Sequence, residues 1–504
     1  MQLRGTMADT ADRDLFGQLA RDGAMIGNLA SDSRRCVPGT AFFAWPGECA
    51  DGRAHIGDAL ARGASAVVWE SRGFHWRGEW ATPNAPVANL RERAGILADL
   101  FHGHPSAAMW VCGVTGTNGK TSCSQWIAAA LQAHGTSAGA IGTLGSGMAG
   151  EKPEESPNTT PDALEVHRIL ASLKARGARA VAMEVSSHGL AQARVNGVRF
   201  RCALLTNLSH DHLDYHGTMQ AYADAKAALF GMPGLETAVL NLDDALGVHL
   251  ARRLGGSGVR TIGYGLSPAA IAPGSVDEFV AARSVEHADG ASRISLSTSR
   301  GEIEASLAHL GRFNAANALA VLGCLLAYGM DLDEAARLIA QLPPVPGRMQ
   351  RIGGGDRPTV VVDYAHTPDA IEKVLNALRP VADAGGGRLV IVFGAGGERD
   401  PDKRPLMGAV AARCADRIIL TSDNPRGEDP HVILAAIGGG VQAAHDVEPD
   451  RAKAIAGAIA AAATGDVILL AGKGHEQYQE IGGWRLPFSD ERVASEALSQ
   501  WRPR

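Results

Sequence analysis

The sequence predicts an α/β protein of several domains, and three observations support this. The chain has 504 residues, more than a single hydrophobic core usually serves. From Trp110 onward, apolar runs typical of buried strands alternate with polar motifs and helical segments, which indicates a mostly parallel sheet covered by helices. The stretches "FHGHPS" at 101–106 and "LPPVPGRM" at 342–349 interrupt this alternation, and we interpret them as joints between domains.

Short apolar runs, each followed by turn or motif residues, define the expected strands in order. The first hundred residues contain "AFFAW" and "ASAVVW" between Gly- and Pro-bearing turns. In the middle segment "WVCGV" leads into "TGTNGKT", "AVAM" into "EVSSHGL" and "CALLTNL" into "SHDHLDYH". In the last segment "TVVV" leads into "DYAHTPD", "LVIVFG" into "AGGERD", "RIIL" into "TSDNPR" and "VILLAG" into "KGHE". Ligands of open α/β sheets bind outside the carboxyl ends of the strands, so we expect one site between two facing sheets.

Composition and charge narrow the class of protein. Hydrophobic residues make up 45% of the chain and charged residues 20%, as in an ordinary globular protein. A net charge of −6 gives no general attraction to nucleic acid or anionic membranes. No apolar stretch has membrane-spanning length, since the Ala-rich helix expected at 454–465 is too short, and the N-terminus lacks the apolar core of a secretion signal. Seven cysteines without CxxC spacing indicate reduced thiols. We therefore expect a cytoplasmic protein with small-molecule partners.

The motif "GTNGKT" at 116–121 is a glycine-rich turn that opens a helix over "SCSQWIAAALQAHG". Glycines let backbone amides approach phosphate oxygens, Lys120 can reach the β- and γ-phosphates, and Thr121 can hold Mg²⁺. Val114 stands where the strict phosphate-loop pattern has its first glycine, and an ordinary strand-to-helix turn is the alternative. The preceding strand and the complete G-K-T ending favour nucleotide binding.

Candidate metal ligands follow the next two strands. Glu184 is a hard oxygen donor suited to Mg²⁺, and Asp211, His212 and Asp214 end another strand. Three histidines in seven residues, at 210, 212 and 216, also suggest zinc, but oxygen-rich strand ends beside a phosphate loop favour magnesium. Polar loop residues without a ligand are the alternative. By its neighbours alone, Lys226 in "YADAKAALF" reads as a solvated helix residue.

The last segment places Arg399, Arg426, Lys473, His475 and Glu476 at successive strand ends. An arginine binds a carboxylate through two hydrogen bonds, and a glutamate can accept an ammonium group. Turn chemistry explains the Asp-Asn-Pro of "TSDNPRGEDP" but not the arginine that follows it. These side chains suit an amino acid with an additional charged end, while surface ion pairs are the alternative.

The motifs "GTNGKT", "NTTPDA", "EVSSHGL", "TNLSHDHLDYHG", "GRFNAANALA", "PGRM", "DYAHTPDA", "SDNPR" and "GKGHE" occur in one order from about Ser31 to the C-terminus. In this the chain resembles the Mur ligases of peptidoglycan synthesis. The resemblance implies three α/β domains. These are a smaller N-terminal domain for the UDP end of the substrate (1–105), a central ATP-binding domain with a P-loop ATPase-type parallel sheet (106–343), and a C-terminal amino-acid-binding domain with a Rossmann-like sheet (344–504).

The resemblance also implies an activity. The D-glutamate γ-carboxylate of UDP-N-acetylmuramoyl-L-Ala-D-Glu would attack the γ-phosphate of ATP, and an amine would displace phosphate from the resulting acyl phosphate. Within the family, "DNPR" marks enzymes that add meso-diaminopimelate, whose extra carboxylate Arg426 would clasp. A lysine-adding enzyme of the same family is the nearest alternative. Arg426 argues against it, because L-lysine lacks that carboxylate and would leave the arginine unpaired. ATP and Mg²⁺ are the expected cofactors, and a monomer is expected.

The resemblance assigns roles to residues of four groups. Lys120, Glu184, His212 and Lys226 would be catalytic, and Thr121, Glu184, His212 and Lys226 (as a carbamate) would bind Mg²⁺, which replaces the solvated interpretation of Lys226. ATP would contact Gly116, Thr117, Asn118, Gly119, Lys120, Thr121, Ser122, Asn317, Arg348 and Asp363. The UDP-linked substrate would contact Ser31, Ser33, Glu48, Cys49, Ala50, Asn158, Thr159, Thr160, Ser186, Gln192 and Arg194, although "ECA" at 48–50 is not the commonest filling of that stretch. Diaminopimelate would contact Arg399, Asp423, Asn424, Pro425, Arg426, Gly472 and Glu476.

Two other classes of protein share part of this pattern. A folylpolyglutamate synthetase-like amide ligase would have the phosphate loop but should lack "DNPR" and "NTTPDA". A P-loop switch that binds a protein partner would need no amino-acid pocket, and the charged strand ends of the last segment disfavour it.

Overall fold

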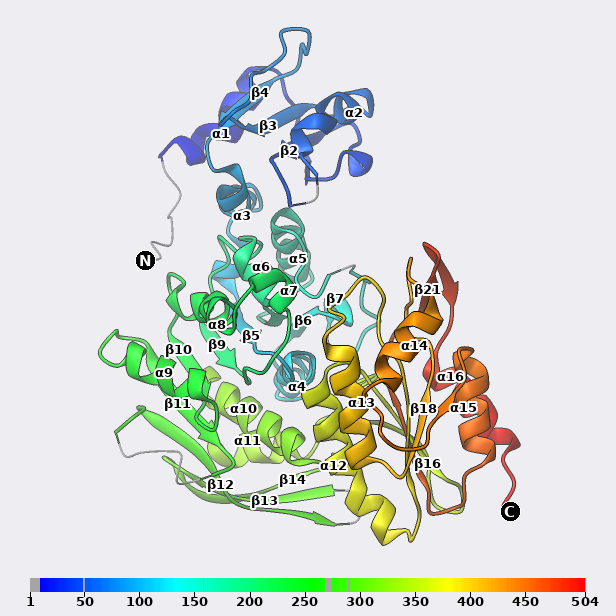
Figure 1. Cartoon of the computed structure of the whole chain (residues 1–504). Coiled ribbons are helices and arrows are strands. Elements are labelled where there is room, and N and C mark those ends of the chain that lie inside the picture. The colour runs from blue at the N-terminus through cyan, green and yellow to red at the C-terminus, as the bar shows by residue number, and fades with distance from the viewer. Residues whose placement is uncertain (1–9, 49, 157, 268–273, 289–290, 504) are drawn as a thin grey trace.

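The structure is a computed structural model that describes residues 10–48, 50–156, 158–267, 274–288 and 291–503. Its larger sheets have four, ten and six strands, and a two-stranded hairpin lies near the C-terminus. In Figure 1 the four-stranded sheet is at the top, the ten-stranded sheet below it and the six-stranded sheet to the right. The prediction of a multidomain α/β protein with parallel sheets is confirmed. The boundaries at 105/106 and 343/344 stay a prediction.

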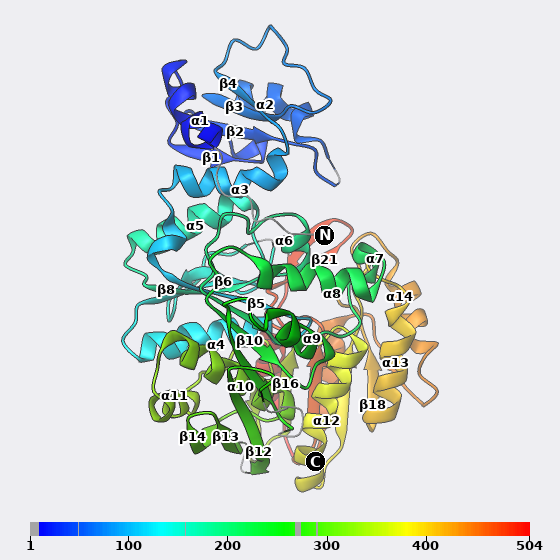
Figure 2. The ribbon, with the colours of Figure 1, turned by 90° about the vertical axis from the view of Figure 1, so that its left-hand side faces the viewer.

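The N-terminal sheet is parallel throughout, in the order β1-β2-β3-β4. Its inner strands are buried on both faces, because helices and a group of aromatic side chains cover them. Helix α3 packs against α5 of the central domain, which joins the two domains in both views (Figures 1 and 2). The elements are α1 (Thr10–Arg21), β1 (Asn28–Ala30), η1 (Ser33–Arg35), β2 (Thr40–Ala44), η2 (Gly52–His55), α2 (Ile56–Ala61), β3 (Ala66–Glu70), β4 (Asn84–Val87) and α3 (Leu90–Phe101).

The central sheet has the order β14-β13-β12-β11-β10-β9-β5-β8-β6-β7. Helices α4, α10 and α11 bury one of its faces and α5, α8 and α9 the other. The elements are η3 (Pro105–Ala108), β5 (Trp110–Thr115), α4 (Lys120–Ala133), β6 (Ala138–Gly142), β7 (Gly145–Met148), α5 (Ala163–Ala175), β8 (Ala180–Glu184), α6 (Ser187–Ala191), β9 (Cys202–Leu205), α7 (Leu213–His216), α8 (Met219–Ala227), η4 (Ala228–Gly231), β10 (Thr237–Asn241), α9 (Ala245–Leu254), β11 (Arg260–Gly265), β12 (Glu278–Ala288), β13 (Ala291–Thr298), β14 (Gly301–Leu307), α10 (Arg312–Tyr328) and α11 (Leu332–Ile339).

The central sheet is less uniformly parallel than the sequence pattern predicted. Strands β12, β13 and β14 form an antiparallel extension at one edge, and β7 pairs antiparallel with β6 at the other. Burial alternates along β13, as expected for a strand with one covered face. This extension was not predicted. It lies at the bottom of Figure 1.

The C-terminal sheet has the order β15-β16-β20-β17-β18-β19 and is parallel except for β15. Helices α12, α13 and α14 cover one face, and α15 and α16 the other. The expected Ala-rich helix is present as α15. The elements are β15 (Gln350–Gly353), β16 (Thr359–Asp363), α12 (Pro368–Ala384), β17 (Leu389–Phe393), α13 (Lys403–Cys414), β18 (Arg417–Leu420), α14 (Pro430–Gly438), β19 (Asp446–Val447), α15 (Arg451–Ala460), β20 (Val467–Ala471), β21 (Tyr478–Ile481), β22 (Trp484–Pro487) and α16 (Asp490–Gln500).

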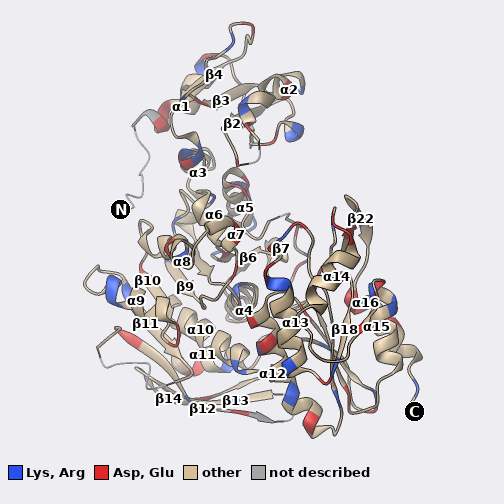
Figure 3. Ribbon diagram, viewed as in Figure 1, with Lys and Arg blue, Asp and Glu red and all other residues tan. Residues whose placement is uncertain are grey.

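Charge and cysteine placement add two observations. Basic and acidic residues are both scattered over all three domains (Figure 3). The six cysteines in the described part of the chain are free, and the Sγ atoms of Cys112, Cys202 and Cys324 lie within 4.8 Å of one another in the central core. Sequence spacing could not reveal that cluster, since its members come from β5, β9 and α10. No described helix combines the length and the apolar character needed to cross a membrane.

Candidate active site

A cavity of about 1190 Å³ lies between the central and C-terminal domains. The seven predicted strands before the motifs are present as β5, β8, β9, β16, β17, β18 and β20. Each of the seven motifs contributes residues to the lining of this one cavity. The seven motifs therefore lie around one cavity between the two sheets, as the sequence predicted.

The phosphate loop joins β5 to α4, and its backbone explains its glycines. Gly116 and Gly119 have φ values of 147° and 88°, in the region that favours glycine. A Cβ on Gly116 would lie 1.8 Å from Thr206 Oγ1, and one on Gly119 would lie 2.5 Å from Asn317 Oδ1. Helix α4 begins at Lys120, so its free N–H groups face the cavity. This arrangement suits an anion such as a phosphate.

Lys120 is folded onto the loop that carries it. Its Nζ donates hydrogen bonds to the carbonyl oxygens of Gly116 and Thr117, both at 2.8 Å. Burial lowers the pKa of Lys120, and the carboxylates of Glu184 and Asp211 partly offset that effect. A short movement of this side chain would bring the ammonium group to a phosphate on the loop.

Glu184 is fully buried at the end of β8 and holds a fixed orientation. Its Oε2 accepts hydrogen bonds from Thr121 Oγ1 at 3.0 Å and Thr143 Oγ1 at 3.1 Å, and its Oε1 accepts one from Thr143 N at 2.8 Å. Arg348 Nη2 donates to the same Thr121 hydroxyl at 3.0 Å. A Cβ on Gly142 would lie 2.2 Å from Glu184 Oε1, so only glycine fits there. Sequence reasoning missed Thr143, which follows a strand that carries no recognisable motif.

His212 lies across the cavity in a left-handed backbone conformation, with φ 53°. Burial lowers its pKa to about 4, against the attraction of Asp211, whose Oδ2 lies 3.3 Å from Nε2. The imidazole is therefore neutral at pH 7 and free to coordinate a metal. The Thr121 hydroxyl and the Glu184 carboxylate are oxygen donors that fit a hard divalent cation such as Mg²⁺, and the His212 imidazole offers a further ligand atom. Among the described residues, only the cysteine cluster brings three potential ligand atoms within 4.8 Å, so His210, His212 and His216 do not form a zinc-type group.

Lys226 is 1% exposed, and its interpretation as a solvated helix residue is wrong. Its Nζ donates to Gly116 O at 2.8 Å and lies 4.3 Å from the centre of the Tyr222 ring. Burial lowers the pKa of Lys226 well below that of a free lysine, and the nearby Lys120 lowers it further. A larger fraction is then the neutral amine, which is the form that reacts with CO₂. The long-range contact with the phosphate loop causes this burial, and local sequence does not encode it.

Asn317, Arg348 and Asp363 line the cavity near the phosphate loop. Asp363 accepts hydrogen bonds from Met349 N and Ala365 N, both at 2.8 Å, and burial raises its pKa. The guanidinium of Arg348 lies over the ring of Tyr364, 4.5 Å from its centre. The C-terminal domain also reaches the loop through Asp369, which accepts hydrogen bonds from Asn118 and Ser209.

The other end of the cavity is formed by the loops after β17, β18 and β20. Asn424 Nδ2 donates to Glu476 Oε2 at 2.8 Å, and the fully buried Lys473 donates to Asn424 Oδ1 at 3.0 Å and Glu476 Oε2 at 2.8 Å. Gly472 has φ 113°, and a Cβ there would lie 2.4 Å from Asp423 Oδ2. Lys473 thus supports two predicted pocket residues from below.

Arg426 has a left-handed backbone conformation with φ 54°, unusual for a residue other than glycine. Its N donates to Glu480 O at 3.0 Å and Gly482 N donates to its carbonyl oxygen at 2.7 Å, so the hairpin β21–β22 holds this conformation. Its Nη1 donates to Gly397 O at 2.6 Å, and its Nε lies 3.5 Å from Glu480 Oε2. The guanidinium lines the cavity together with Arg399.

Some of the residues predicted to bind the UDP-linked substrate line the large cavity, and the others lie outside its lining. Asn158, Thr159, Thr160, Ser186 and Arg194 line the large cavity. Arg194 Nη1 donates to Thr160 O at 2.8 Å and Nε to Gln192 Oε1 at 2.9 Å, which fixes this side of the cavity.

Glu48 belongs to the N-terminal domain but contacts the central one. It accepts hydrogen bonds from Gln192 Nε2 at 2.8 Å, from Arg91 Nη2 at 3.0 Å and from the hydroxyl of Tyr215. Ser31, Ser33 and Ala50 lie in the N-terminal domain away from the lining of the large cavity, and Cys49 lies outside the described residues. Four other predicted residues are not among those that line the large cavity: Gly116, Gln192, Lys226 and Pro425.

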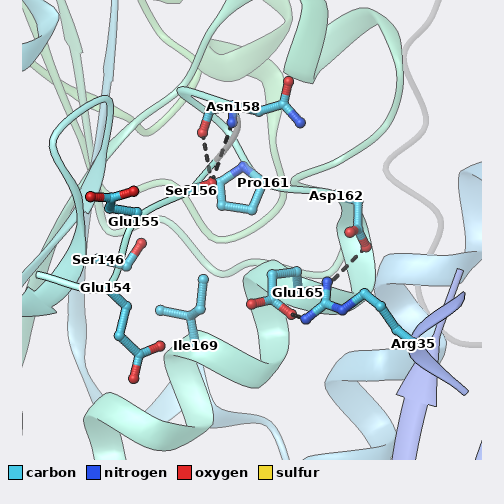
Figure 4. A pocket seen from close by; sticks show the side chains of 10 residues that line it. All are labelled: Arg35, Ser146, Glu154, Glu155, Ser156, Asn158, Pro161, Asp162, Glu165 and Ile169. Carbon is cyan, nitrogen blue, oxygen red and sulfur yellow. Dashed lines mark hydrogen bonds and ion pairs between the residues drawn. The ribbon is translucent and has the colours of Figure 1, made fainter. Parts of the chain in front are cut away.

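A second, smaller cavity of about 270 Å³ lies beside Arg35 of the N-terminal domain and the start of α5 (Figure 4). Arg35 Nη2 is 3.2 Å from Glu165 Oε2, so an ion pair closes one side. Burial raises the pKa of Asp162, which caps α5 through Leu164 N at 3.0 Å. Asn158 lines both cavities, so the two lie next to each other.

Three family models match the chain in succession. They are "Mur ligase family, catalytic domain" over residues 25–102, "Mur ligase middle domain" over 114–325 and "Mur ligase, glutamate ligase domain" over 347–474. The chain belongs to the Mur ligase family. The resemblance inferred from the motifs is thereby confirmed.

Similar Mur ligases include two UDP-N-acetylmuramoyl-L-alanyl-D-glutamate–2,6-diaminopimelate ligases. That of Chromobacterium violaceum is 49% identical over 506 residues, covering 100% of both chains. That of Pseudomonas aeruginosa is 51% identical and covers 97% of this chain and 98% of the relative. A solved structure with the same enzyme name is 35% identical, with a TM-score of 0.65 over 94% of this chain and 95% of that one. A MurF ligase from Thermotoga maritima in complex with ADP shares the fold, at 18% identity and a TM-score of 0.65 over 94% of this chain and 99% of that one.

Proposed function

We propose that this Mur ligase uses ATP to add meso-2,6-diaminopimelate to the D-Glu γ-carboxylate of UDP-N-acetylmuramoyl-L-Ala-D-Glu. The observation that carries the proposal is one cavity with a phosphate loop at one end and Asn424, Arg426 and Glu476 at the other. The names of relatives about 50% identical over the whole chain support the same reaction.

In the first step, ATP would lie on the loop 116–122, with adenosine or phosphate contacts from Asn317, Arg348 and Asp363. Lys120 would leave its two loop carbonyls and pair with the β- and γ-phosphates. Thr121, Glu184, His212 and Lys226 as a carbamate would hold the two Mg²⁺ ions, which would supply positive charge beside the phosphates. A carbamate converts the buried lysine into an anionic oxygen donor at a place where an ammonium group is poorly tolerated.

The γ-carboxylate oxygen would attack the γ-phosphorus, with ADP as the leaving group and an acyl phosphate as the product. Asn158, Thr159, Thr160, Ser186, Gln192 and Arg194 would position the muramoyl-dipeptide, and Ser31, Ser33 and residues 48–50 would hold the UDP end. The protein's main contribution is to bring the reacting groups together and stabilise charge.

In the second step, the amine of diaminopimelate would attack the acyl carbon, form the amide bond and release phosphate. Arg426 would bind the far carboxylate through two charge-assisted hydrogen bonds. Arg399, Asp423, Asn424, Pro425, Gly472 and Glu476 would complete the pocket around the remaining polar groups. L-lysine has no carboxylate at that end, so Arg426 would keep only Gly397 O and Glu480 as partners and would add nothing to the binding of lysine.

The test measures phosphate release with ATP, Mg²⁺ and UDP-N-acetylmuramoyl-L-Ala-D-Glu, with meso-diaminopimelate, L-lysine or no amino acid. We expect release only with diaminopimelate, and a product heavier by one diaminopimelate residue. Release with L-lysine alone would keep the ligase and overturn the assignment of Arg426. Release with neither amino acid would contradict the proposed function. Size-exclusion chromatography with light scattering would test the predicted monomer.

A further inference from the structure

Beneath the proposed amino-acid pocket lies a fully buried ion pair between the first residues of two helices. Arg451 begins α15 and Asp490 begins α16, and both side chains are 0% exposed. Arg451 Nε donates to Asp490 Oδ1 at 2.7 Å and Nη2 to Asp490 Oδ2 at 2.6 Å. This is a two-pronged pair of the kind that fixes a guanidinium in one orientation.

The remaining N–H groups of Arg451 reach the ends of two strands. Nη2 donates to Ala471 O at 3.0 Å, and Nη1 lies 3.4 Å from Ser422 O. Ala471 is the last residue of β20, directly before Gly472, and Ser422 directly precedes Asp423 in the loop after β18. The guanidinium therefore contacts the backbone immediately before both halves of the proposed pocket.

The sheet alone does not set the distance between these two strand ends. In the order β20-β17-β18, strand β17 lies between them. Two strand spacings amount to roughly 9–10 Å in a regular sheet, so a β18 residue and a β20 residue are not hydrogen-bonded neighbours. Arg451 spans that gap from below, and Asp490 ties it to the C-terminal helix α16.

We propose that Arg451 and Asp490 are positioning residues for the amino-acid pocket, because they hold the loops 423–426 and 472–476 at a fixed separation. That separation sets the distance between the guanidinium of Arg426 and the carboxylate of Glu476, which would grip opposite ends of one amino acid. The identity of that amino acid rests on the proposed function. The positioning itself rests on the hydrogen bonds of Arg451 to Ser422 O and Ala471 O, which add to the direct bonds between the loops, from Asn424 to Glu476 and from Lys473 to Asn424.

Stability does not explain the pair. Removing two charges from water is costly, and replacing a buried ion pair with apolar residues of similar volume is often neutral or stabilising. Burial acts to lower the pKa of Arg451, but the carboxylates of Asp490, Asp423 and Glu476 together raise it above its usual value. The cation thus lies close to the pocket carboxylates as well as to its own partner, which suits a role in arranging them.

Two variants test the proposal. Arg451→Lys keeps the positive charge but cannot form the paired hydrogen bonds of a guanidinium to Asp490. Arg451→Met combined with Asp490→Leu removes both charges, so that neither is left unpaired. The matched control is Arg388→Lys. Arg388 pairs with Asp466 at 2.8 Å, and these residues directly precede β17 and β20 at the opposite end of the same sheet.

For both test variants we expect KM for meso-diaminopimelate to rise at least tenfold, with kcat within about threefold and KM for ATP and the UDP-linked substrate unchanged. The melting temperature of the double variant should stay within a few degrees of wild type, and Arg388→Lys should leave every KM unchanged. A KM for diaminopimelate within twofold of wild type in folded Arg451→Lys and in the double variant would overturn the proposal. Failure of both variants to fold would also overturn it, because the pair would then be structural only.

The wild-type assay separates this inference from the proposed function. If the wild type adds another amino acid, the proposed function fails, and the positioning is judged by KM for the amino acid that is added.

Discussion

The phosphate end of the cavity is made of backbone groups and fully buried side chains, whereas the amino-acid end is made of side chains carried on three loops. At the phosphate end, glycines without room for a Cβ, a helix N-terminus and the buried Glu184 and Lys226 leave little freedom. At the amino-acid end, Arg426 and Glu476 depend on Lys473, on the hairpin β21–β22 and on Arg451 for their placement. The difference teaches that one end binds a ligand common to many enzymes, while the other selects a particular one.

The largest effect should come from the phosphate end. Lys120→Ala removes the cation that would pair with the transferred phosphate, and removing one such charge-stabilising group costs roughly 10²–10³ in rate. We expect that loss in kcat with meso-diaminopimelate, measured as ADP formation. Lys453→Ala, which changes an exposed side chain of α15, is the control. A loss confined to KM for diaminopimelate would break the distinction between the two ends.

Removing Arg426 should affect only selection. In Arg426→Ala the far carboxylate of diaminopimelate loses its partner. The Arg426 side chain is 22% exposed, so the loss should lie at the lower end for charge pairs, about 2 kcal/mol or roughly 30-fold in kcat/KM. KM for ATP should not change, and the preference for diaminopimelate over L-lysine should collapse. Arg485→Ala on the neighbouring hairpin is the control. An unchanged preference would show that selection lies elsewhere.

The stability of the protein should fall in acid because of His475, which lies in the loop after β20. Burial and the nearby Arg348 lower the pKa of His475 from 6.5 to about 4. Between these values the unfolded state binds the proton and the folded state does not, so this histidine makes stability fall as pH drops from 6.5 toward 4 and contributes nothing above 6.5. The upper limit is roughly 3 kcal/mol at pH 4.

His475→Gln should flatten that part of the pH dependence, measured by urea unfolding at pH 7, 6, 5 and 4.5. His431→Gln, at an exposed position on α14, provides the comparison. Equal slopes in His475→Gln and wild type would contradict the assigned cause.

The smallest effect is expected at Glu48, where the N-terminal domain contacts the central domain. Glu48→Gln weakens hydrogen bonds that a partly exposed carboxylate makes to Arg91, Gln192 and Tyr215, which are worth about 1 kcal/mol or less each. KM for the UDP-linked substrate should rise a few-fold, and KM for diaminopimelate should not change. A fall in the first KM would mean that Glu48 competes with the substrate instead of binding it.

At the phosphate end, the sequence predicted the loop and its helix but not the contacts that surround them. "GTNGKT" after an apolar run gave the loop and its helix, because glycine geometry and a helix N-terminus are local properties. The burial of Lys226 arises from contact with Gly116, 110 residues away, and no local pattern encodes it. Thr143 and Gly142 matter only because β6 lies beside β8 in the folded sheet.

At the amino-acid end, the strand-end rule and "DNPR" predicted which side chains meet, since each loop follows a parallel strand. The supports escaped prediction for a physical reason. Arg451 and Asp490 are 39 residues apart, and the short strands before them, β19 and β22, are not marked by an apolar run in the sequence. The left-handed conformation of Arg426 depends on a hairpin more than fifty residues later. The antiparallel edge β12–β14 was missed as well, since the strand-motif-helix rhythm does not extend to it.

The two ends are useful to each other only if they act on the same carboxylate, and one isotope measurement tests this directly. UDP-N-acetylmuramoyl-L-Ala-D-Glu labelled with ¹⁸O in the γ-carboxylate would be incubated with ATP, Mg²⁺ and meso-diaminopimelate, and the released phosphate analysed by mass spectrometry. One ¹⁸O atom in each phosphate is the predicted result, because the carboxylate oxygen leaves with the phosphoryl group. Unlabelled phosphate would mean that water attacks ATP, and that the two ends of the cavity do not meet over one acyl group.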